Sequence, residues 1–380
     1  MRRVLSMVLL LLAAACAPLA ERPASTISPS MAAQAADVGQ RVAAWHIAHS
    51  KDDSIATRWA SEVRNQHSWV QGAGYTGLLR WARISGSPTA RNATLAWARA
   101  NKFELGPRKY HADDHTVGQV YLKLREMGLA GDEALAPTKA KFDSILASPP
   151  TGDLAMTDGG RDCSDRWCWS DALFMAPPVW EALSKATGDP RYAAFSDREF
   201  WATTDFLFDK QEGLYYRDSR FITRKGPAGE KIFWSRGNGW VAGGIINLLE
   251  VMPANAPERR RYEDLLRAMA TGIKRSQKPD GYWTPSLAAP SGVPEISGSA
   301  FFVYALQRGI DLNVLPAAEY APVVQRGWAA IVRHVGPDGR VGSVQQIGDA
   351  PDEVKPDSTQ LYGSGAVLLA ASALVQAGNK

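Results

Sequence analysis

Residues 237–251 read GNGWVAGGIINLLEV, a run of glycine, alanine and large apolar residues with one charge near its end. A helix that is apolar on every side is typical of a protein core. Stretches of this kind recur at intervals of about 45 to 70 residues, a period typical of repeats built from helix pairs. The other five begin at Trp69, His115, Asp171, Ser297 and Tyr362.

Between these stretches lie segments whose apolar residues recur at helical spacing, which predicts amphipathic helices on the outside. Long alternating strand patterns and a strand–helix alternation are missing from the sequence. We therefore predict an all-α fold, an (α/α)6 barrel that forms one domain over residues 38–380. An open solenoid is the alternative, but it lacks a polar capping repeat at its C-terminal end. The amphipathic segments are 38–61, 89–100, 134–147, 193–208, 258–277 and 320–334.

Residues 1–16 have the pattern of a bacterial export signal. Two arginines precede an apolar run too short to span a bilayer, and three alanines then lead to Cys16. This predicts a lipoprotein in which Cys16 carries the lipid anchor, in the periplasm or cell envelope. Plain secretion is the alternative, because Ala13 stands where lipoproteins usually have leucine. The Ala/Ser/Pro-rich residues 17–37 predict a flexible tether.

Composition and charge exclude several classes of protein. The chain has 45% hydrophobic and 22% charged residues, unlike a disordered, collagenous or polytopic membrane protein. Its net charge of +4 is not clustered, so no nucleic-acid partner is expected. Cys163 and Cys168 either form a disulfide in an oxidising compartment or remain free thiols. They lack a histidine cluster beside them, and neither a metal nor a cofactor is implied.

Carboxylates occur where inner helices begin. In a barrel these starts meet at one rim, so function is expected there. Asp114 and Asp171 both occupy such starts, Asp114 next to His115 and Asp171 shortly after Trp167 and Trp169. Helix capping alone would explain an aspartate at this position. Tryptophans beside a carboxylate favour a sugar-binding cleft instead.

A third cluster lies in the segment FWSRGNGWVAGG at 233–244. Arg236 stands between Trp234 and Trp240, and its fork of donors suits a carboxylate. Tryptophan faces suit the apolar faces of pyranose rings. The alternative interpretation makes both tryptophans core residues and Arg236 a surface ion-pair partner. The glycines around Arg236 favour a site.

Three blocks carry a resemblance to a known family: WSDALFMAPPVWEALSKATGDPRY from Trp169, FWSRGNGWVAGG from Phe233, and DDHTVGQVYL from Asp113. Together they resemble the unsaturated glucuronyl and rhamnogalacturonyl hydrolases of glycoside hydrolase families 88 and 105, over about residues 69–365. The resemblance implies an (α/α)6 barrel. It also implies release of a 4,5-unsaturated uronic acid from the non-reducing end of an oligosaccharide that a polysaccharide lyase has left.

The same resemblance implies roles for individual residues. Asp171 matches the catalytic aspartate, which acts as general acid and then base, and Asp114 matches the second aspartate. Arg217 stands where the best-known relatives have a histidine, which leaves the adjacent sugar open. The residues expected to bind substrate are Trp69, His115, Trp167, Trp169, Arg217, Trp234, Arg236 and Trp240.

Other functions remain as alternatives. Pectin-derived rhamnogalacturonan fragments are the first expected substrates. A sugar 2-epimerase shares the fold but needs two histidines that face the sugar, and only His115 lies at the predicted rim. A glycan-binding lipoprotein would use the same aromatic cleft without turnover. Asp171→Asn separates a binder from a hydrolase.

Overall fold

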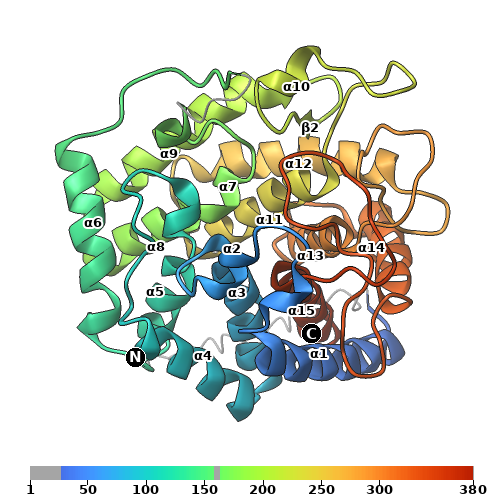
Figure 1. Ribbon diagram of the computed structural model, residues 1–380, viewed down its shortest axis with the longest axis horizontal. Coiled ribbons are helices and arrows are strands. Elements are labelled where there is room, and N and C mark those ends of the chain that lie inside the picture. Colours follow the sequence, from blue (N-terminus) through green and yellow to red (C-terminus); the bar gives the residue numbers. More distant parts are fainter. Residues whose placement is uncertain (1–26, 158–162, 380) are drawn as a thin grey trace, which may run out of the picture.

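The computed structural model describes residues 27–157 and 163–379, and the long helices in this part form two concentric rings (Figure 1). Each inner helix contacts the next, and α3 contacts both α5 and α15, so the ring is closed. The (α/α)6 barrel is confirmed over the open solenoid. The inner helices are α3 (Trp69–Ser85), α5 (Gly118–Glu126), α7 (Ala172–Met175) continued by α8 (Pro177–Thr187), α11 (Ser235–Val251), α13 (Ile296–Asp311) and α15 (Leu361–Gly378).

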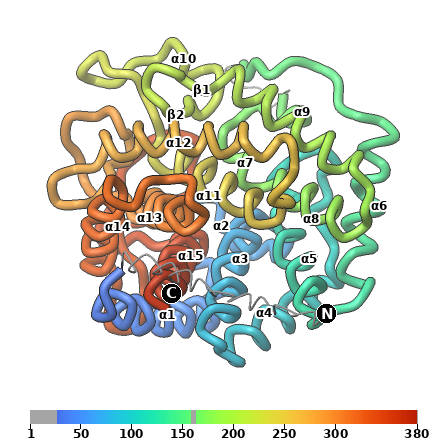
Figure 2. The backbone as a smooth tube through the Cα atoms, turned by 180° about the vertical axis from the view of Figure 1, so that it is seen from behind, coloured from blue at the N-terminus to red at the C-terminus, as the bar shows by residue number. Residues whose placement is uncertain are grey.

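The outer ring carries the amphipathic helices. Figure 2, from behind, shows α3, α11, α13 and α15 surrounded by outer helices. In α12, Tyr262, Leu266 and Ile273 are buried against the inner ring, while Arg260 and Arg261 near its start are exposed. The outer helices are α1 (Pro29–His49), α4 (Pro88–Ala100), α6 (Ala136–Ala147), α9 (Pro190–Leu207), α12 (Arg259–Ser276) and α14 (Ala317–Val332).

Small residues bring the inner helices together. Gly77 of α3 packs against the backbone of Gly365 on α15, and a Cβ on Gly365 would lie 2.6 Å from the Ala73 carbonyl oxygen. Gly244 of α11 packs in the same way against the backbone of α7. By length and composition α15 is apolar enough to cross a membrane, but 83% of that window is buried inside the barrel. The apolar composition of α15 is therefore explained by its burial in the core of the barrel.

The N-terminal helix begins earlier and ends earlier than its sequence pattern predicts. Ser28 caps α1 through Met31, and Ala35 is buried, so residues 29–37 are helical where we expected a tether. The helix ends at His49, and the chain continues through the 3₁₀ turn η1 (Asp53–Ile55) and α2 (Ala60–Arg64). The expected signal at 1–16 lies outside the described residues.

Two inner helices are interrupted close to the rim. Pro177 lacks a backbone N–H and begins a new helix, which separates α7 from α8 at Ala176. Ahead of α5 the chain forms the 3₁₀ turn η2 (Ala112–His115) rather than α-helix. Short elements surround this rim. They are η4 (Ser164–Arg166), the hairpin of β1 (Phe208–Asp209) and β2 (Leu214–Tyr215), and α10 (Arg220–Thr223). The turn η3 (Asp132–Ala134) lies at the other end of the barrel, between the end of α5 and the start of α6.

Candidate active site

A cavity of about 420 Å³ opens at the rim where the inner helices begin. Its wall comes from both halves of the chain, so only the closed ring assembles it. Cations, carboxylates and aromatic faces line the cavity together, a combination suited to an acidic sugar. The charged and tryptophan residues of the wall are Trp59, Glu62, Trp69, Arg108, Asp113, Trp169, Asp171, Arg217, Arg220, Trp234, Arg236, Trp240 and Asp349.

Asp171 lies at the start of α7 with its carboxyl in the cavity. The carboxyl makes no capping bond to α7, so the capping interpretation does not explain it. Burial raises the pKa of Asp171 to about 6, against the opposing effect of Arg217 and Arg236; Asp113 adds to the rise. Arg217 Nε lies 3.6 Å from Asp171 Oδ2, and Ser170 Oγ lies 3.3 Å from the same oxygen. A carboxyl with this pKa can hold a proton near neutral pH and donate it.

Asp114, expected at the site, bonds to Arg108 and is not part of the cavity wall. Its carboxylate accepts hydrogen bonds from the Arg108 backbone N–H at 2.6 Å and from the Arg108 guanidinium at 2.5 and 3.0 Å. The side chain packs against Gly106, where a Cβ would lie 2.5 Å from the carboxyl carbon. Asp114 thus holds the turn before α5 and does not line the cavity. The reason is the 3₁₀ turn, which directs neighbouring side chains to different sides.

Asp113 lines the cavity in place of Asp114. Its carboxylate lies 3.8 Å from His111 Nδ1, and the His111 ring packs at 4.8 Å from the Trp169 ring. Asp113 is also the carboxylate that raises the pKa of Asp171. Sequence reasoning missed Asp113 although it stands in the same Asp-Asp doublet, because only the backbone geometry of η2 distinguishes the two.

Arg236 is fully buried among aromatic rings and backbone carbonyls. Its guanidinium lies 4.4 Å from the Trp234 ring centroid and 4.8 Å from that of Tyr362. The Gln345 and Gln346 carbonyls accept from its two Nη atoms at 2.7 and 3.0 Å. Among the residues that the structure describes, Arg236 forms no ion pair with a carboxylate. A buried cation without an anionic partner favours an anionic ligand.

Arg217 reaches Asp171 from the loop after β2 and is held by a buried partner. Asp218 is fully buried and accepts from Arg217 Nη1 at 2.8 Å and from Arg220. Arg220 continues to Asp349 at 3.0 Å. These arginines hold the pKa of Asp218 below its usual range against the effect of burial. The chain of ion pairs therefore orients Arg217 toward the reacting carboxyl.

The tryptophans divide into cavity and core. Trp69, Trp169, Trp234 and Trp240 line the cavity as expected, and Trp69 stacks on Tyr362 at 5.1 Å. Trp167 does not line it, because its ring is buried against Phe195.

His115 does not line the cavity either. It is buried against Phe142, and its Nε2 donates to the Lys109 carbonyl at 3.0 Å. Burial lowers the pKa of His115 to about 3, so the ring stays neutral. Both Trp167 and His115 were expected to bind substrate, and the structure places both in buried, largely apolar surroundings outside the cavity wall.

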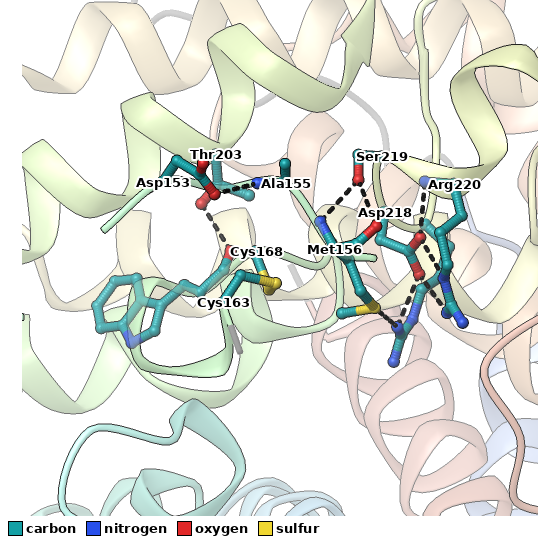
Figure 3. Close-up of a disulfide and its surroundings, with 11 residues drawn as sticks. Asp153, Ala155, Met156, Cys163, Cys168, Thr203, Asp218, Ser219 and Arg220 are labelled. Atoms are coloured by element: carbon teal, nitrogen blue, oxygen red, sulfur yellow. Dashed lines mark hydrogen bonds and ion pairs between the residues drawn. A yellow bond between two sulfur atoms is a disulfide. The ribbon is translucent and has the colours of Figure 1, made fainter. Parts of the chain in front are cut away.

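A disulfide braces one side of the cavity mouth. Cys163 and Cys168 are bonded, with their Cα atoms 5.8 Å apart, which decides between the two expected alternatives. The bond closes the loop around η4, and Arg166 of that turn pairs with Glu199 of α9 at 2.7 Å. Figure 3 shows the disulfide near Met156, with Ser219, Asp218 and Arg220 on the far side of Met156. Ser164 of the closed loop lines the cavity.

Residues that sequence reasoning missed include His111, Arg108, Arg220 and Trp59, all in the cavity wall. The Arg-Trp pair at 58–59 carried an aromatic signal, but the sequence pattern placed it in the amphipathic segment 38–61 and not at the rim. Within residues 27–157 and 163–379, no group of three or more His, Cys, Asp or Glu side chains is placed to hold a metal ion.

Comparison with known proteins agrees with this geometry. The family model described as Glycosyl Hydrolase Family 88 matches residues 38–377. A protein of Alteromonas sp. (strain LOR) named unsaturated 3S-rhamnoglycuronyl hydrolase is 41% identical over 91% of this chain and 87% of its own. A protein of the same name from Formosa agariphila is 36% identical over 81% and 84%. The solved glycosyl hydrolase family 88 structure from Bacteroides vulgatus is 25% identical, with a TM-score of 0.80 over 91% and 99%.

Proposed function

The chain belongs to glycosyl hydrolase family 88 and is a glycosidase, and we propose that it releases 4,5-unsaturated uronic acid from the non-reducing end of lyase-generated oligosaccharides. The observation that carries this proposal is the buried carboxyl of Asp171, with its pKa raised to about 6, in a cavity that also contains the buried cation Arg236. The first provides a proton donor. The second provides a counter-charge for a uronate carboxylate.

The chemistry that suits these groups is hydration of the C4=C5 double bond. Protonated Asp171 donates its proton to C4, and the resulting carboxylate then accepts a proton from the water whose oxygen bonds to C5. The hemiketal so formed opens and expels the aglycone. Asp113 favours the protonated form of Asp171 by like-charge repulsion. Arg217 opposes this rise in the pKa of Asp171 and orients the Asp171 carboxyl.

For the aglycone we propose rhamnose. The two relatives described above carry names that specify an unsaturated rhamnoglycuronyl substrate. The sequence led us to expect rhamnogalacturonan fragments and left the sugar next to the uronate open. The aromatic and cationic wall supports an acidic disaccharide of this size.

The experiment follows the ultraviolet absorbance of the conjugated uronate during incubation with unsaturated rhamnoglycuronyl and rhamnogalacturonan disaccharides. Wild-type protein should remove the absorbance, and Asp171→Asn should not. Asp205→Asn, on the outer helix α9 and outside the cavity wall, is the matched control and should retain wild-type turnover.

A glycan-binding protein gives the opposite pattern. It would show a flat trace with every unsaturated uronide and equal affinity before and after Asp171→Asn. The sugar 2-epimerase alternative needs a histidine pair, and among the residues described in the cavity wall His111 is the one histidine.

We also propose that the protein is exported and anchored in the cell envelope by lipid on Cys16. The signal pattern of residues 1–16 supports this, as does the Cys163–Cys168 disulfide, since such bonds persist in oxidising compartments. The intact mass of the N-terminal peptide from exported protein tests it, and an unmodified N-terminus would refute the lipid anchor.

A further inference from the structure

Trp59 is an exposed aromatic residue at the mouth of the cavity. The exposed large apolar side chains of the described chain are Trp59, Phe206 and Val293, and of these only Trp59 lines the cavity, with 48% of its surface exposed. The other tryptophans of the wall are buried or half-buried. Leaving an indole in water forgoes the free energy that its burial would provide, so an exposed one beside a cavity favours ligand contact.

The backbone at Trp59 has a conformation that tryptophan rarely adopts. Its φ of 51° and ψ of 41° lie in the left-handed region, which favours glycine or asparagine. Such strain persists where surrounding contacts determine the conformation, and it concentrates at ligand sites.

The contacts that hold this conformation come from both sides of the residue. Gln346 Oε1 accepts from the Thr57 N–H at 3.0 Å, and the Trp59 carbonyl accepts from the Glu62 N–H at 2.8 Å. Arg58 pairs with Asp352 and places its guanidinium 5.8 Å from the Trp59 ring. The indole is therefore carried on a segment bonded to the loop before α15.

Position along the cavity indicates what the indole contacts. Asp171, Arg236 and Trp240 are all buried, which defines an enclosed end for the uronate. Trp59 and the half-exposed Asp349 define the open end. An exo-acting enzyme holds the sugar that it releases at the closed end and the aglycone at the open end.

We propose that Trp59 is the platform on which the aglycone sugar stacks, and that it makes the enzyme prefer a pyranose aglycone over a small alcohol. The inference rests on the proposed function. The indole offers a flat apolar face to the C–H face of the pyranose ring attached to the uronate, and Arg58 restrains the indole by a cation–π contact.

The test compares two substrates with one reacting group: the unsaturated rhamnoglycuronyl disaccharide and the methyl glycoside of the same unsaturated uronic acid. For Trp59→Ala, KM for the disaccharide should rise about tenfold more than KM for the methyl glycoside, while kcat for the disaccharide changes by about twofold or less. Trp59→Phe should restore most of the preference. Phe206→Ala removes an exposed aromatic side chain outside the cavity and should leave KM for both substrates unchanged.

Equal effects of Trp59→Ala on both substrates, or none on the disaccharide, would overturn the proposal. If Trp59→Ala does not fold, Trp59→Asn, which tolerates the left-handed backbone, replaces it with the same expected difference. A wild-type protein that converts neither substrate would instead overturn the proposed function, and the platform with it.

Discussion

At the scale of single residues, the behaviour of this site depends on where one proton resides. Burial raises the pKa of the Asp171 carboxyl in the cavity. Arg217 and Arg236 lower that pKa, and Asp113 raises it further. Neighbours in sequence do not share its environment. Asp113 lines the cavity, whereas Asp114 accepts hydrogen bonds from Arg108. The two side chains point to different sides because both residues lie in the 3₁₀ turn η2.

The pH dependence of the reaction should report this carboxyl directly. Because the proton donor must be protonated, kcat/KM should fall as pH rises through about 6. Arg217 lowers the pKa of Asp171, so Arg217→Gln should move this alkaline limb to higher pH. It should also lower kcat/KM about tenfold.

The control for that profile is Arg99→Gln, an exposed arginine on α4 away from the cavity. Its profile should overlay that of the wild type. An alkaline limb that stays in place in Arg217→Gln would contradict the electrostatic role of Arg217, whatever the loss of rate.

The same carboxyl should destabilise the native protein at neutral pH. Its native pKa of about 6 exceeds the ordinary 3.8, so the free energy of unfolding falls as pH rises from about 4 to 6 and stays low above 6. Asp171→Asn removes this effect and should raise the free energy of unfolding by roughly 3 kcal/mol at pH 8, but by little at pH 4. Denaturant unfolding at the two pH values measures it. An equal gain in the free energy of unfolding at pH 4 and pH 8 would contradict a raised pKa of Asp171 as its cause.

At the scale of elements, the inner helices approach one another because glycines allow it. The α3–α15 crossing places Gly77 against Gly365, and the α11–α7 crossing places Gly244 against Leu173 and Phe174. These contacts hold the helix starts, and the catalytic groups on them, at one rim. The composition of the segment at 237–251 predicted such an inner helix, but not which residues of the helix face the neighbour.

Gly77→Ala should therefore destabilise the barrel. The new Cβ meets the backbone of Gly365, which cannot move aside as a flexible side chain can. The expected loss is about 1–3 kcal/mol in the free energy of unfolding. Gly131→Ala is the matched control, because its Cβ meets only the end of the Glu133 side chain and its φ is −94°. Similar losses in both variants would contradict the crossing argument.

At the scale of the whole molecule, the last helix is covered by the first. His46 of α1 bonds to Ser364 of α15 at 2.6 Å, and Gln34 accepts from Trp328 of α14 at 3.1 Å. The ring of outer helices is thus completed by α1, whose first residues stand where a tether was expected.

Two truncations test this closure. A chain that starts at residue 27 keeps the buried Ile27, Ser28 as cap and all of α1, and it should unfold at the wild-type temperature. A chain that starts at residue 38 loses the buried Ala35 and the Gln34–Trp328 bond, and it should unfold at a clearly lower temperature. Equal melting temperatures would mean that residues 27–37 act as a tether after all.

Some of the site was predictable because the signal is local. Arg236 with its flanking tryptophans, and Asp171 beside Trp169, stand in short blocks whose composition is unusual for a core helix. The disulfide was one of two open alternatives for Cys163 and Cys168. His115 and Trp167 carried the same local signal, yet the structure places them outside the cavity wall.

The sequence by itself determined the class of fold, the family and two of the main charged groups, because hydrophobic period and short motifs are properties of neighbouring residues. Only the tertiary structure decided which carboxylate faces Asp171, which aromatic residues reach the cavity, and that Trp59 lies at its mouth. These depend on backbone turns and on contacts between segments as far apart as Arg58 and Asp352. Contacts between segments so far apart in the sequence form only when the ring of helices closes.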